Sequence, residues 1–301
     1  ETLAKKGLLK IVTREWDRTS LNEEEFFQTK PKILNPQQKE TLEKIVKGLS
    51  HHFETHLVFG VTGSGKTEVY LQAVDQALKK GAGVLIMVPE IALTTQLIDR
   101  FKGRFKEKIA ILHHRLSDGE RFDAWHKLRR GEIKMALGAR SAVFAPVHNL
   151  KLIIVDEEHE GSYKQTDEMP CYHARDVAVM RGKMENAVVV LGSATPSLES
   201  AYNAYQNKYT YSLMQDRHGA SLPKIKIIDM KREYEKAKGY TIFSDELLSK
   251  IQERKERGEQ SILFLNRRGF HTSVMCLSCG SSIQCKHCDQ SMTFHKKETA
   301  L

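Results

Sequence analysis

The chain has 301 residues, of which 40% are hydrophobic and 28% charged, the balance of a folded globular protein. It has no run of about 18 apolar residues and no apolar leader with a cleavage site, so we expect a cytoplasmic protein with no membrane partner. Lys and Arg outnumber Asp and Glu by 47 to 38, and the net charge of +9 favours a polyanionic partner because neutralising phosphates releases counterions.

Short apolar segments alternate with helical ones along most of the chain. Strands are predicted at 56–60, 84–89, 109–114 and 133–139, with strands that run into loops at 150–159 and 187–196. Helices are predicted at 36–49, 67–81, 91–105, 118–130, 175–185 and 197–207. This alternation predicts a parallel sheet with helices on both faces, whose ligand-binding loops follow the carboxyl ends of the strands.

Changes in composition divide the chain into five segments. We expect the end of a preceding domain at 1–14, a polar linker at 15–35, an α/β domain at 36–220, the start of a second α/β unit at 221–270 and a cysteine-rich segment at 271–301. In the second unit, strands are predicted at 224–230 and 261–266 on either side of a charged helix at 244–257.

A phosphate-binding loop, or P-loop, follows the first predicted strand. The motif G-x-x-x-x-G-K-[ST] matches Gly60, Val61, Thr62, Gly63, Ser64, Gly65, Lys66 and Thr67. Its backbone N–H groups are expected to cradle phosphate oxygens, with Lys66 at the β- and γ-phosphates and the Thr67 hydroxyl on Mg²⁺. The motif lies between a strand and a helix, which is the context that a P-loop requires.

An acidic strand end, DEEH, completes the predicted ATP site. The apolar strand at 150–155 delivers Asp156 and Glu157 to the edge of the sheet. We expect Asp156 to hold Mg²⁺ through water and Glu157 to orient and deprotonate the attacking water. A solvated acidic turn is the alternative, and the preceding P-loop weighs against it.

The order GSGKT, DEEH and GSATP resembles the superfamily 2 helicases, whose ATP-binding lobe has a RecA-like fold. The resemblance implies that Ser193 and Thr195 of GSATP couple the ATP site to the nucleic-acid groove, as does His159 of DEEH. It also implies that the segment 89–97 corresponds to motif Ia and that Gln38 contacts adenine.

The chain resembles more narrowly the primosomal protein N′ (PriA) family of replication-restart helicases. The shared segments include GVTGSGKTEVYL, VPEIALTTQL, GARSAVFAP, SYKQTDEMPCYHARD, LGSATPSLES, LFLNRRGF and two CxxC pairs, in sequence order. The resemblance implies an ATP-dependent 3′→5′ DNA helicase that recognises stalled or repaired forks. It implies as partners single-stranded DNA, other primosome proteins and the single-stranded-DNA-binding protein. By this resemblance, residues 1–14 are the end of a winged-helix domain and 221–270 begin a second RecA-like lobe.

The same resemblance assigns DNA contacts. The segment 163–175 corresponds to an aromatic-rich loop that senses single-stranded DNA, in which Tyr163 and Tyr172 can stack on bases while Lys164 and Arg175 meet phosphates. An ordinary surface loop is the alternative. The further candidates, in two other segments, are Arg140 and Ser141 of GARSAVFAP, and Arg267 and Arg268 of LNRRGF.

Four of the five cysteines form two pairs with the spacing of zinc knuckles. The four are Cys276, Cys279, Cys285 and Cys288, and Cys171 stands apart. The spacing allows one all-cysteine Zn²⁺ site, with His287 and His295 as substitute ligands. The PriA family implies instead two interleaved zinc sites, each of which needs a later cysteine pair that this sequence does not contain.

The later helicase motifs, including the arginine finger, are also absent from the sequence. An arginine finger contributes about 10³–10⁵ in rate, so we expect an internal fragment that binds ATP with Mg²⁺ but hydrolyses it weakly and unwinds nothing. Two alternatives stay open. One is another superfamily 2 translocase, and the other is a primosome scaffold that binds DNA structures and whose ATPase activity is dispensable.

Overall fold

The computed structural model describes residues 29–50, 52–89, 95–105, 109–112, 116–217, 224–239 and 241–264. The chain forms two compact units, Glu1–Leu222 and Pro223–Leu301. Across the described residues, no helix is long and apolar enough to cross a membrane. The predicted domain limits at 14, 35 and 270 stay predictions.

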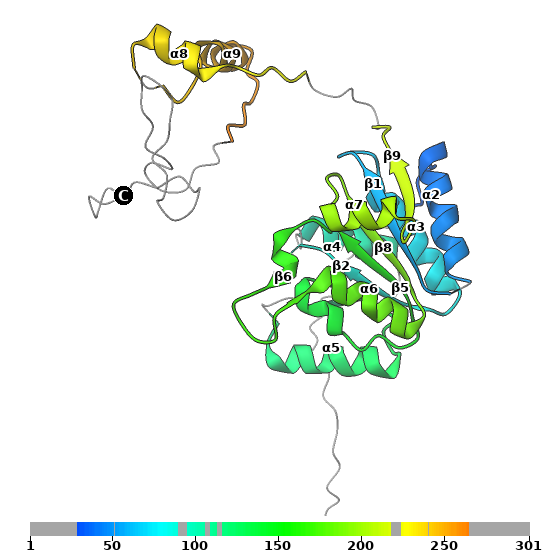
Figure 1. The fold of residues 1–301 in the computed structure, drawn as a ribbon. Coiled ribbons are helices and arrows are strands. Elements are labelled where there is room, and N and C mark those ends of the chain that lie inside the picture. Colours follow the sequence, from blue (N-terminus) through cyan, green and yellow to red (C-terminus); the bar gives the residue numbers. More distant parts are fainter. Residues whose placement is uncertain are drawn as a thin grey trace, which may run out of the picture. The chain divides into compact units, whose positions relative to one another are not determined.

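One sheet of seven strands, all parallel, forms the centre of the first unit (Figure 1). The strands are β1 Glu54–Gly60, β2 Gly83–Met87, β3 Ile109–Leu112, β4 Met135–Gly138, β5 Leu150–Asp156, β8 Val188–Ser193 and β9 Thr210–Met214. Their order in space is β3-β4-β2-β5-β8-β1-β9. The parallel α/β architecture predicted from the sequence is confirmed, and β5, β8 and β1 lie next to one another.

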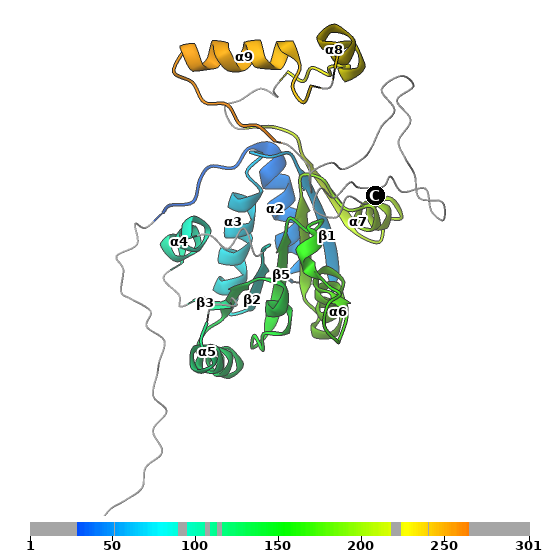
Figure 2. The ribbon, with the colours of Figure 1, turned by 90° about the vertical axis from the view of Figure 1, so that its left-hand side faces the viewer.

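Helices cover both faces of this sheet (Figure 2). They are α2 Pro36–Gly48, α3 Lys66–Lys79, α4 Thr95–Arg104, α5 Asp118–Arg130, α6 Ala174–Glu185 and α7 Leu198–Tyr205. Side chains of α2, α3 and α4 share one hydrophobic cluster with the sheet, and those of α5 and α6 share the other. Along β5, Ile154 faces the first cluster while Ile153 and Val155 face the second. This strand is therefore apolar throughout, as a strand buried on both faces must be.

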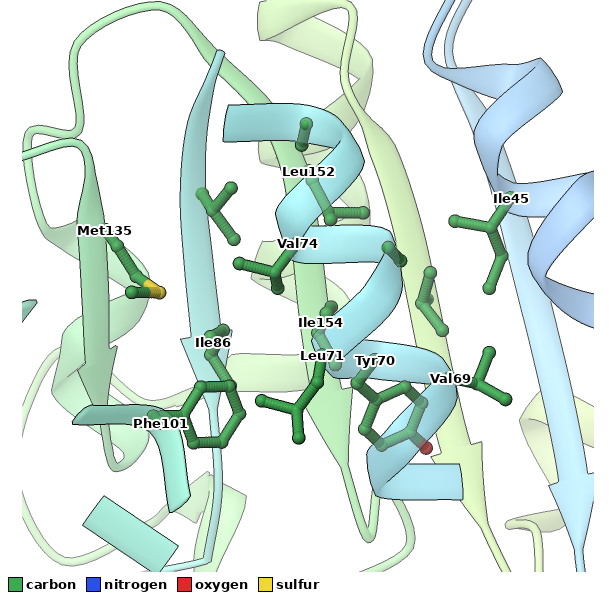
Figure 3. Packing of buried hydrophobic residues seen from close by; sticks show 14 of the residues in the cluster. Ile45, Val69, Tyr70, Leu71, Val74, Ile86, Phe101, Met135, Leu152 and Ile154 are labelled. Carbon is green, nitrogen blue, oxygen red and sulfur yellow. The ribbon is translucent and has the colours of Figure 1, made fainter. Parts of the chain in front are cut away.

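Helix α3 anchors the end of the P-loop to the core. Its side chains Val69, Tyr70 and Val74 are fully or almost fully buried in the hydrophobic cluster that also contains Ile86 and Ile154 of the sheet (Figure 3). Burying one such aliphatic side chain stabilises the fold by about 1.5–3 kcal/mol. The helix whose first residue is Lys66 is consequently held firmly against the strands that carry the other motifs.

Several short elements were not predicted. Strand β9 pairs with β1 at the edge of the sheet. A 3₁₀ turn spans Arg140–Phe144, and a second 3₁₀ turn at Gly161–Tyr163 leads into a small antiparallel hairpin. That hairpin is formed by β6 Lys164–Gln165 and β7 Tyr172–His173. The two 3₁₀ turns and the hairpin follow the carboxyl ends of β4 and β5, whereas β9 lies on the far side of β1.

The second unit differs from the prediction. It contains α8 Met230–Ala237 and α9 Asp245–Glu256, and α9 confirms the helix predicted at 244–257. The strands predicted at 224–230 and 261–266 are wrong wherever residues are described, because a strand needs a hydrogen-bonded neighbour and none is described beside either segment. Asp229 instead caps α8 by accepting a hydrogen bond from the Lys231 N–H.

Candidate functional site

The P-loop curls between β1 and α3 as its motif requires. Gly63 and Gly65 both have φ of +82°, a left-handed conformation that glycine adopts without steric cost. A Cβ at Gly65 would lie 2.4 Å from Nε2 of Gln38, so a side chain here would be strained by the positive φ and would displace the Gln38 amide. The N–H of Val61 donates to the Met214 carbonyl and is therefore not directed at a ligand.

Lys66 is buried and its ammonium donates to the Gly60 carbonyl at 2.7 Å. The group closes the loop on itself, and no carboxylate among the described residues pairs with it. A buried cation held only by a backbone carbonyl is poorly compensated. It is therefore available to an anionic ligand such as a polyphosphate.

The carboxyl end of β5 presents Asp156 and Glu157 opposite this cation. Burial, reinforced by the neighbouring charge of Glu157 and partly opposed by Lys66, raises the pKa of Asp156 from 3.8 to about 6. Glu157 has φ of +46°, a strained conformation for a non-glycine residue. Its side chain is about one third exposed, so it remains accessible in the cleft.

A cavity of about 560 Å³ joins the P-loop to the acidic residues. It is lined by Thr62, Gly63, Ser64, Gly65, Lys66 and Thr67, by Gln38, Asp156 and Glu157, and on its far side by the segment 29–33 and α4. Ser64 Oγ and Asp156 Oδ1 are buried without a hydrogen-bond partner among the described residues. A cavity of this size with a buried cation and a free carboxylate oxygen fits a nucleoside triphosphate with a hard divalent cation.

Gln38 lies at the site, but its amide is engaged by the protein. Nε2 donates to the Ser64 carbonyl at 2.8 Å, while Oε1 accepts from the Asn35 N–H at 2.9 Å in the capping box that begins α2. For the expected contact with adenine, Gln38 retains one amide hydrogen and one lone pair of its carbonyl oxygen. In this structure Gln38 primarily supports the P-loop.

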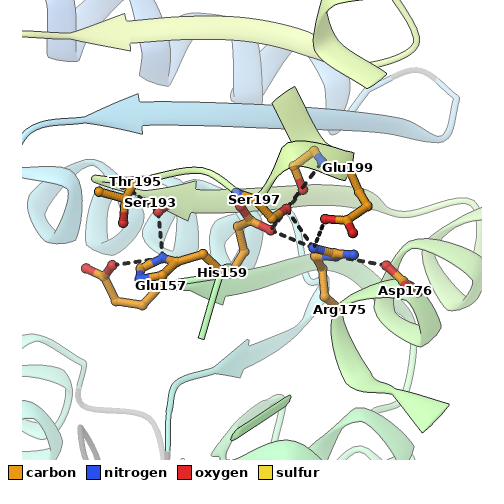
Figure 4. Close-up of polar contacts among 10 residues, drawn as sticks. Glu157, His159, Arg175, Asp176, Ser193, Thr195, Ser197 and Glu199 are labelled. Carbon is orange, nitrogen blue, oxygen red and sulfur yellow. Dashed lines mark hydrogen bonds and ion pairs between the residues drawn. The ribbon is translucent and has the colours of Figure 1, made fainter. Parts of the chain in front are cut away.

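Glu157, His159, Ser193 and Thr195 form one continuous chain of contacts (Figure 4). Nδ1 of His159 lies 3.6 Å from a carboxylate oxygen of Glu157 and 2.7 Å from the Ser193 hydroxyl oxygen. That hydroxyl oxygen in turn accepts the Thr195 N–H at 2.8 Å. The two motifs named DEEH and GSATP are therefore linked by direct hydrogen bonds.

Arg175 differs from its expected role as an exposed phosphate contact. It is only 6% exposed and pairs with Glu158 at 3.3 Å and with Asp176 at 2.8 Å. Glu158 is fully buried and also accepts hydrogen bonds from Ser197 and Ser200 (Figure 4). A buried arginine with this many partners joins α6 to the loop after β5 and is not free for DNA.

Tyr163 also differs from the expectation, because it is fully buried and cannot stack on a base. Its hydroxyl donates to the Asp156 carbonyl at 2.8 Å, which steadies the end of β5. Burial raises the pKa of Tyr163 far above its usual range, so the phenol stays protonated. The aromatic side chain that does reach the surface is Phe144, which meets Tyr172 edge to face with centroids 5.2 Å apart.

The remaining candidates for DNA contact gather beside that aromatic pair. Lys164 is exposed on β6, and Arg140 donates to the Lys164 carbonyl at 3.1 Å, so the two predicted DNA segments lie side by side. Ser141 is exposed in the same 3₁₀ turn. The predicted contacts are thus brought together, except for Tyr163 and Arg175, which face inward.

Six predicted site residues lie outside the described residues. They are Arg267, Arg268, Cys276, Cys279, Cys285 and Cys288, and their predicted roles stay predictions. In the described ranges no cluster of three or more His, Cys, Asp or Glu side chains is arranged to hold a metal ion. Cys171 is exposed on the loop between β6 and β7.

Glu158 is the functional neighbour that sequence reasoning missed. It follows Asp156 and Glu157 directly, and three acidic residues in a row resemble a solvated turn. The signal that could have identified it is the pattern of serines at 197 and 200, which lie one helical turn apart after GSATP. Both hydroxyls donate to the Glu158 carboxylate.

Comparisons with known proteins agree with this geometry. The family model described as DEAD/DEAH box helicase matches residues 35–204. The chain is 50% identical over 306 residues to the replication restart protein PriA of Chlamydia pneumoniae, covering 100% of this chain and 40% of that protein. It is 46% identical over 300 residues to PriA of Bacillus subtilis (strain 168), covering 98% and 37%.

These relatives confirm the resemblance to PriA, and the chain spans about 40% of the length of the curated relatives it matches. Among solved structures, RecG bound to a three-way DNA junction aligns with a TM-score of 0.53 and 22% identity, over 76% of this chain and 28% of that chain. At that identity the likeness bears on the fold alone. A DEAD/DEAH box helicase domain binds ATP with Mg²⁺, which agrees with the cavity between Lys66 and Asp156. The chain therefore belongs to the DEAD/DEAH box helicase family.

Proposed function

We propose that this chain is the ATP-binding lobe of a 3′→5′ DNA helicase that acts in replication restart. The observation that carries the proposal is the chain of contacts from Glu157 to His159, at ion-pair distance, and from His159 through Ser193 to Thr195 by hydrogen bonds, beside a cavity that fits a nucleotide. A nucleotide-binding fold without a motor function has no need for such a link. The relatives, which are replication restart proteins, supply the biological setting.

The side chains of the cavity divide the work of the ATPase. When ATP binds, the Lys66 ammonium would leave the Gly60 carbonyl and bind the β- and γ-phosphates. The Thr67 hydroxyl and the Asp156 carboxylate would hold the Mg²⁺ ion of the nucleotide. When bound, Mg²⁺ neutralises charge on the transferring phosphoryl group. Glu157 orients the attacking water and accepts its proton, and His159 responds to the change in charge on Glu157.

Single-stranded DNA is the proposed partner of the surface around Phe144. Tyr172 supports the Phe144 ring, and the cations Arg140 and Lys164 lie next to it. Aromatic rings flanked by cations bind single strands with little sequence preference, at about 1–3 kcal/mol per stacked base. Forks, other primosome proteins and the single-stranded-DNA-binding protein complete the proposed set of partners.

The Lys66→Ala substitution tests the motor. In this chain we expect it to remove binding of Mg·ATP while a dT₂₀ strand still binds. In a chain of the relatives' full length that contains this sequence, we expect it to abolish unwinding of a forked duplex. Unwinding that survives Lys66→Ala contradicts the proposal, whereas fork binding and partner loading that survive without unwinding support an additional scaffold role.

The direction of unwinding and the binding of zinc are tested by separate measurements. Duplexes with only a 3′ or only a 5′ single-stranded tail test direction, and we expect unwinding from the 3′ tail. Zinc per chain, measured by elemental analysis, tests the proposed sites at Cys276, Cys279, Cys285 and Cys288. Preparations free of zinc at full cysteine reduction would contradict the zinc sites.

A further inference from the structure

The segment 29–33, here called the strap, crosses the first turn of α3 without regular structure. Its ends are fixed by hydrogen bonds. The Thr29 N–H donates to the Gly103 carbonyl at 2.9 Å, and Lys32 exchanges bonds with two side chains of α3. The sequence alone predicted only a linker here, so the fixed position of the strap is a property of the fold.

Glu68 is the centre of these contacts. Its Oε1 atom accepts hydrogen bonds from the Lys32 N–H at 3.1 Å, from Gln72 Nε2 at 2.8 Å and from Arg104 Nη2 at 2.7 Å. The side chains of Glu68 and Arg104 are only 12% and 5% exposed. Hydrogen bonds to ionised partners at such lengths are among the stronger ones in proteins. One buried carboxylate therefore fastens the strap and α4 to α3.

The strap and the P-loop line the same cavity. Lys30, Lys32 and Ile33 of the strap face it together with Glu68 of α3 and with Arg100 and Arg104 of α4. The P-loop accommodates phosphates, so the remaining space beside the strap receives the rest of the ligand. Glu68 follows directly after Thr67, the last residue of the P-loop motif. The residue that fastens the strap is therefore adjacent in the chain to the residues that bind phosphate.

Gln38 has only half of its hydrogen-bonding capacity left for a base edge, because its amide also bonds to Ser64 and Asn35. What the strap does offer is the apolar side chain of Ile33, which is 94% exposed, and the long side chains of Lys30 and Lys32. Such side chains hold a base and ribose by packing and by their methylene stems. Packing of this kind depends on the strap staying in place.

We propose that Glu68 and Arg104 are positioning residues for the nucleoside half of the nucleotide site, holding the strap so that it packs against the base and ribose. This inference rests on the proposed nucleotide-binding function and adds to it the residues that decide how the non-phosphate part is held. Neither residue touches the phosphates in this assignment. Their loss is therefore expected to weaken ATP while sparing a ligand that consists of phosphates only.

Two ligands distinguish the contribution of the nucleoside half of the site from that of the phosphate half. Affinities of this chain for a non-hydrolysable ATP analogue and for inorganic tripolyphosphate, each with Mg²⁺, are measured by competition with a fluorescent nucleotide. We expect Glu68→Ala and Arg104→Ala each to weaken the ATP analogue about tenfold and to change tripolyphosphate by less than about twofold. The double variant is expected to lose no more than either single variant, because both act through one set of contacts. Glu68→Gln, which keeps the acceptor oxygen, is expected to restore much of the affinity.

Asp75→Ala is the matched control, since it removes another acidic residue of α3 whose ion pair with Lys79 is exposed. It is expected to change neither affinity. Equal losses for both ligands, or ATP affinity that survives both alanine variants, overturn the inference, as does tripolyphosphate that fails to compete with the wild type. A wild-type chain that binds neither ligand overturns the proposed function itself, and that result is distinct from the others.

Discussion

Removing Arg175 is expected to destabilise the first unit rather than to weaken DNA binding. The Arg175→Ala variant leaves the Glu158 carboxylate fully buried without its cation. Breaking a buried ion pair costs about 3–5 kcal/mol because the remaining charge is uncompensated. Glu158 keeps its hydrogen bonds from the Ser197 N–H and from the hydroxyls of Ser197 and Ser200, so we expect the lower end, about 3 kcal/mol.

Thermal unfolding followed by circular dichroism measures this change. A domain of this size shifts by about 2–4 °C per kcal/mol, so Arg175→Ala is expected to lower Tm by about 6–12 °C. Adding Glu158→Gln should recover part of the loss, because a neutral amide tolerates the buried position better. Arg140→Ala is the control, since that half-buried arginine makes one hydrogen bond to the Lys164 carbonyl and should cost less than about 1 kcal/mol.

Two outcomes would contradict the structural role of Arg175. If Arg175→Ala leaves Tm unchanged but weakens binding of a dT₂₀ strand, the arginine contacts phosphate and its buried network contributes little. If both Arg175→Ala and Arg140→Ala lower Tm equally, the loss reflects general sensitivity of the unit. Only a large effect confined to Arg175, and reduced by Glu158→Gln, supports the reasoning.

Three further predictions concern the ATP site. Without Mg²⁺, Asp156 binds its proton more tightly in the folded than in the unfolded chain, so the free energy of unfolding should fall by about 3 kcal/mol as pH rises from about 4 to above 6. Asp156→Asn should abolish that fall, measured in urea titrations at pH 4 and pH 8. Tyr163→Phe should cost about 1 kcal/mol in the same titrations, through loss of the hydrogen bond to the Asp156 carbonyl, and leave DNA affinity unchanged. Gly65→Ala should eliminate binding of a fluorescent ATP analogue, since the added Cβ meets Gln38 at 2.4 Å; retained binding would show that the loop can shift.

The features that the sequence predicted best are those set by local pattern. The P-loop, the acidic end of β5 and the GSATP segment each follow an apolar strand, and the carboxyl ends of parallel strands share one edge of the sheet. Their proximity therefore follows from the alternation of strands and helices alone. The structure adds that β5, β8 and β1 are immediate neighbours, with Asp156 and Val58 both paired to Gly192.

The features that were missed depend on contacts between distant residues. Arg175 and Glu158 are 17 residues apart, and nothing local distinguishes a buried arginine from one that meets phosphates. Tyr163 has the composition of a stacking residue, but the 3₁₀ turn that precedes β6 rotates it into the core. Strand β9 escaped notice because it lies at the sheet edge, where Tyr211 and Leu213 are exposed and no fully apolar run results.

The three acidic residues at the end of β5 differ in burial, and the buried one orients its exposed neighbour. Glu157 has a left-handed backbone conformation, which costs about 1–2 kcal/mol for a residue with a side chain. The strain is maintained because Glu158, next in the chain, is held by its N–H on the Gly192 carbonyl and by its carboxylate on Arg175. The buried Glu158 thus turns Glu157 outward into the cleft. A substitution at Glu158 should accordingly alter the orientation of Glu157 even though Glu158 itself never reaches the ligand.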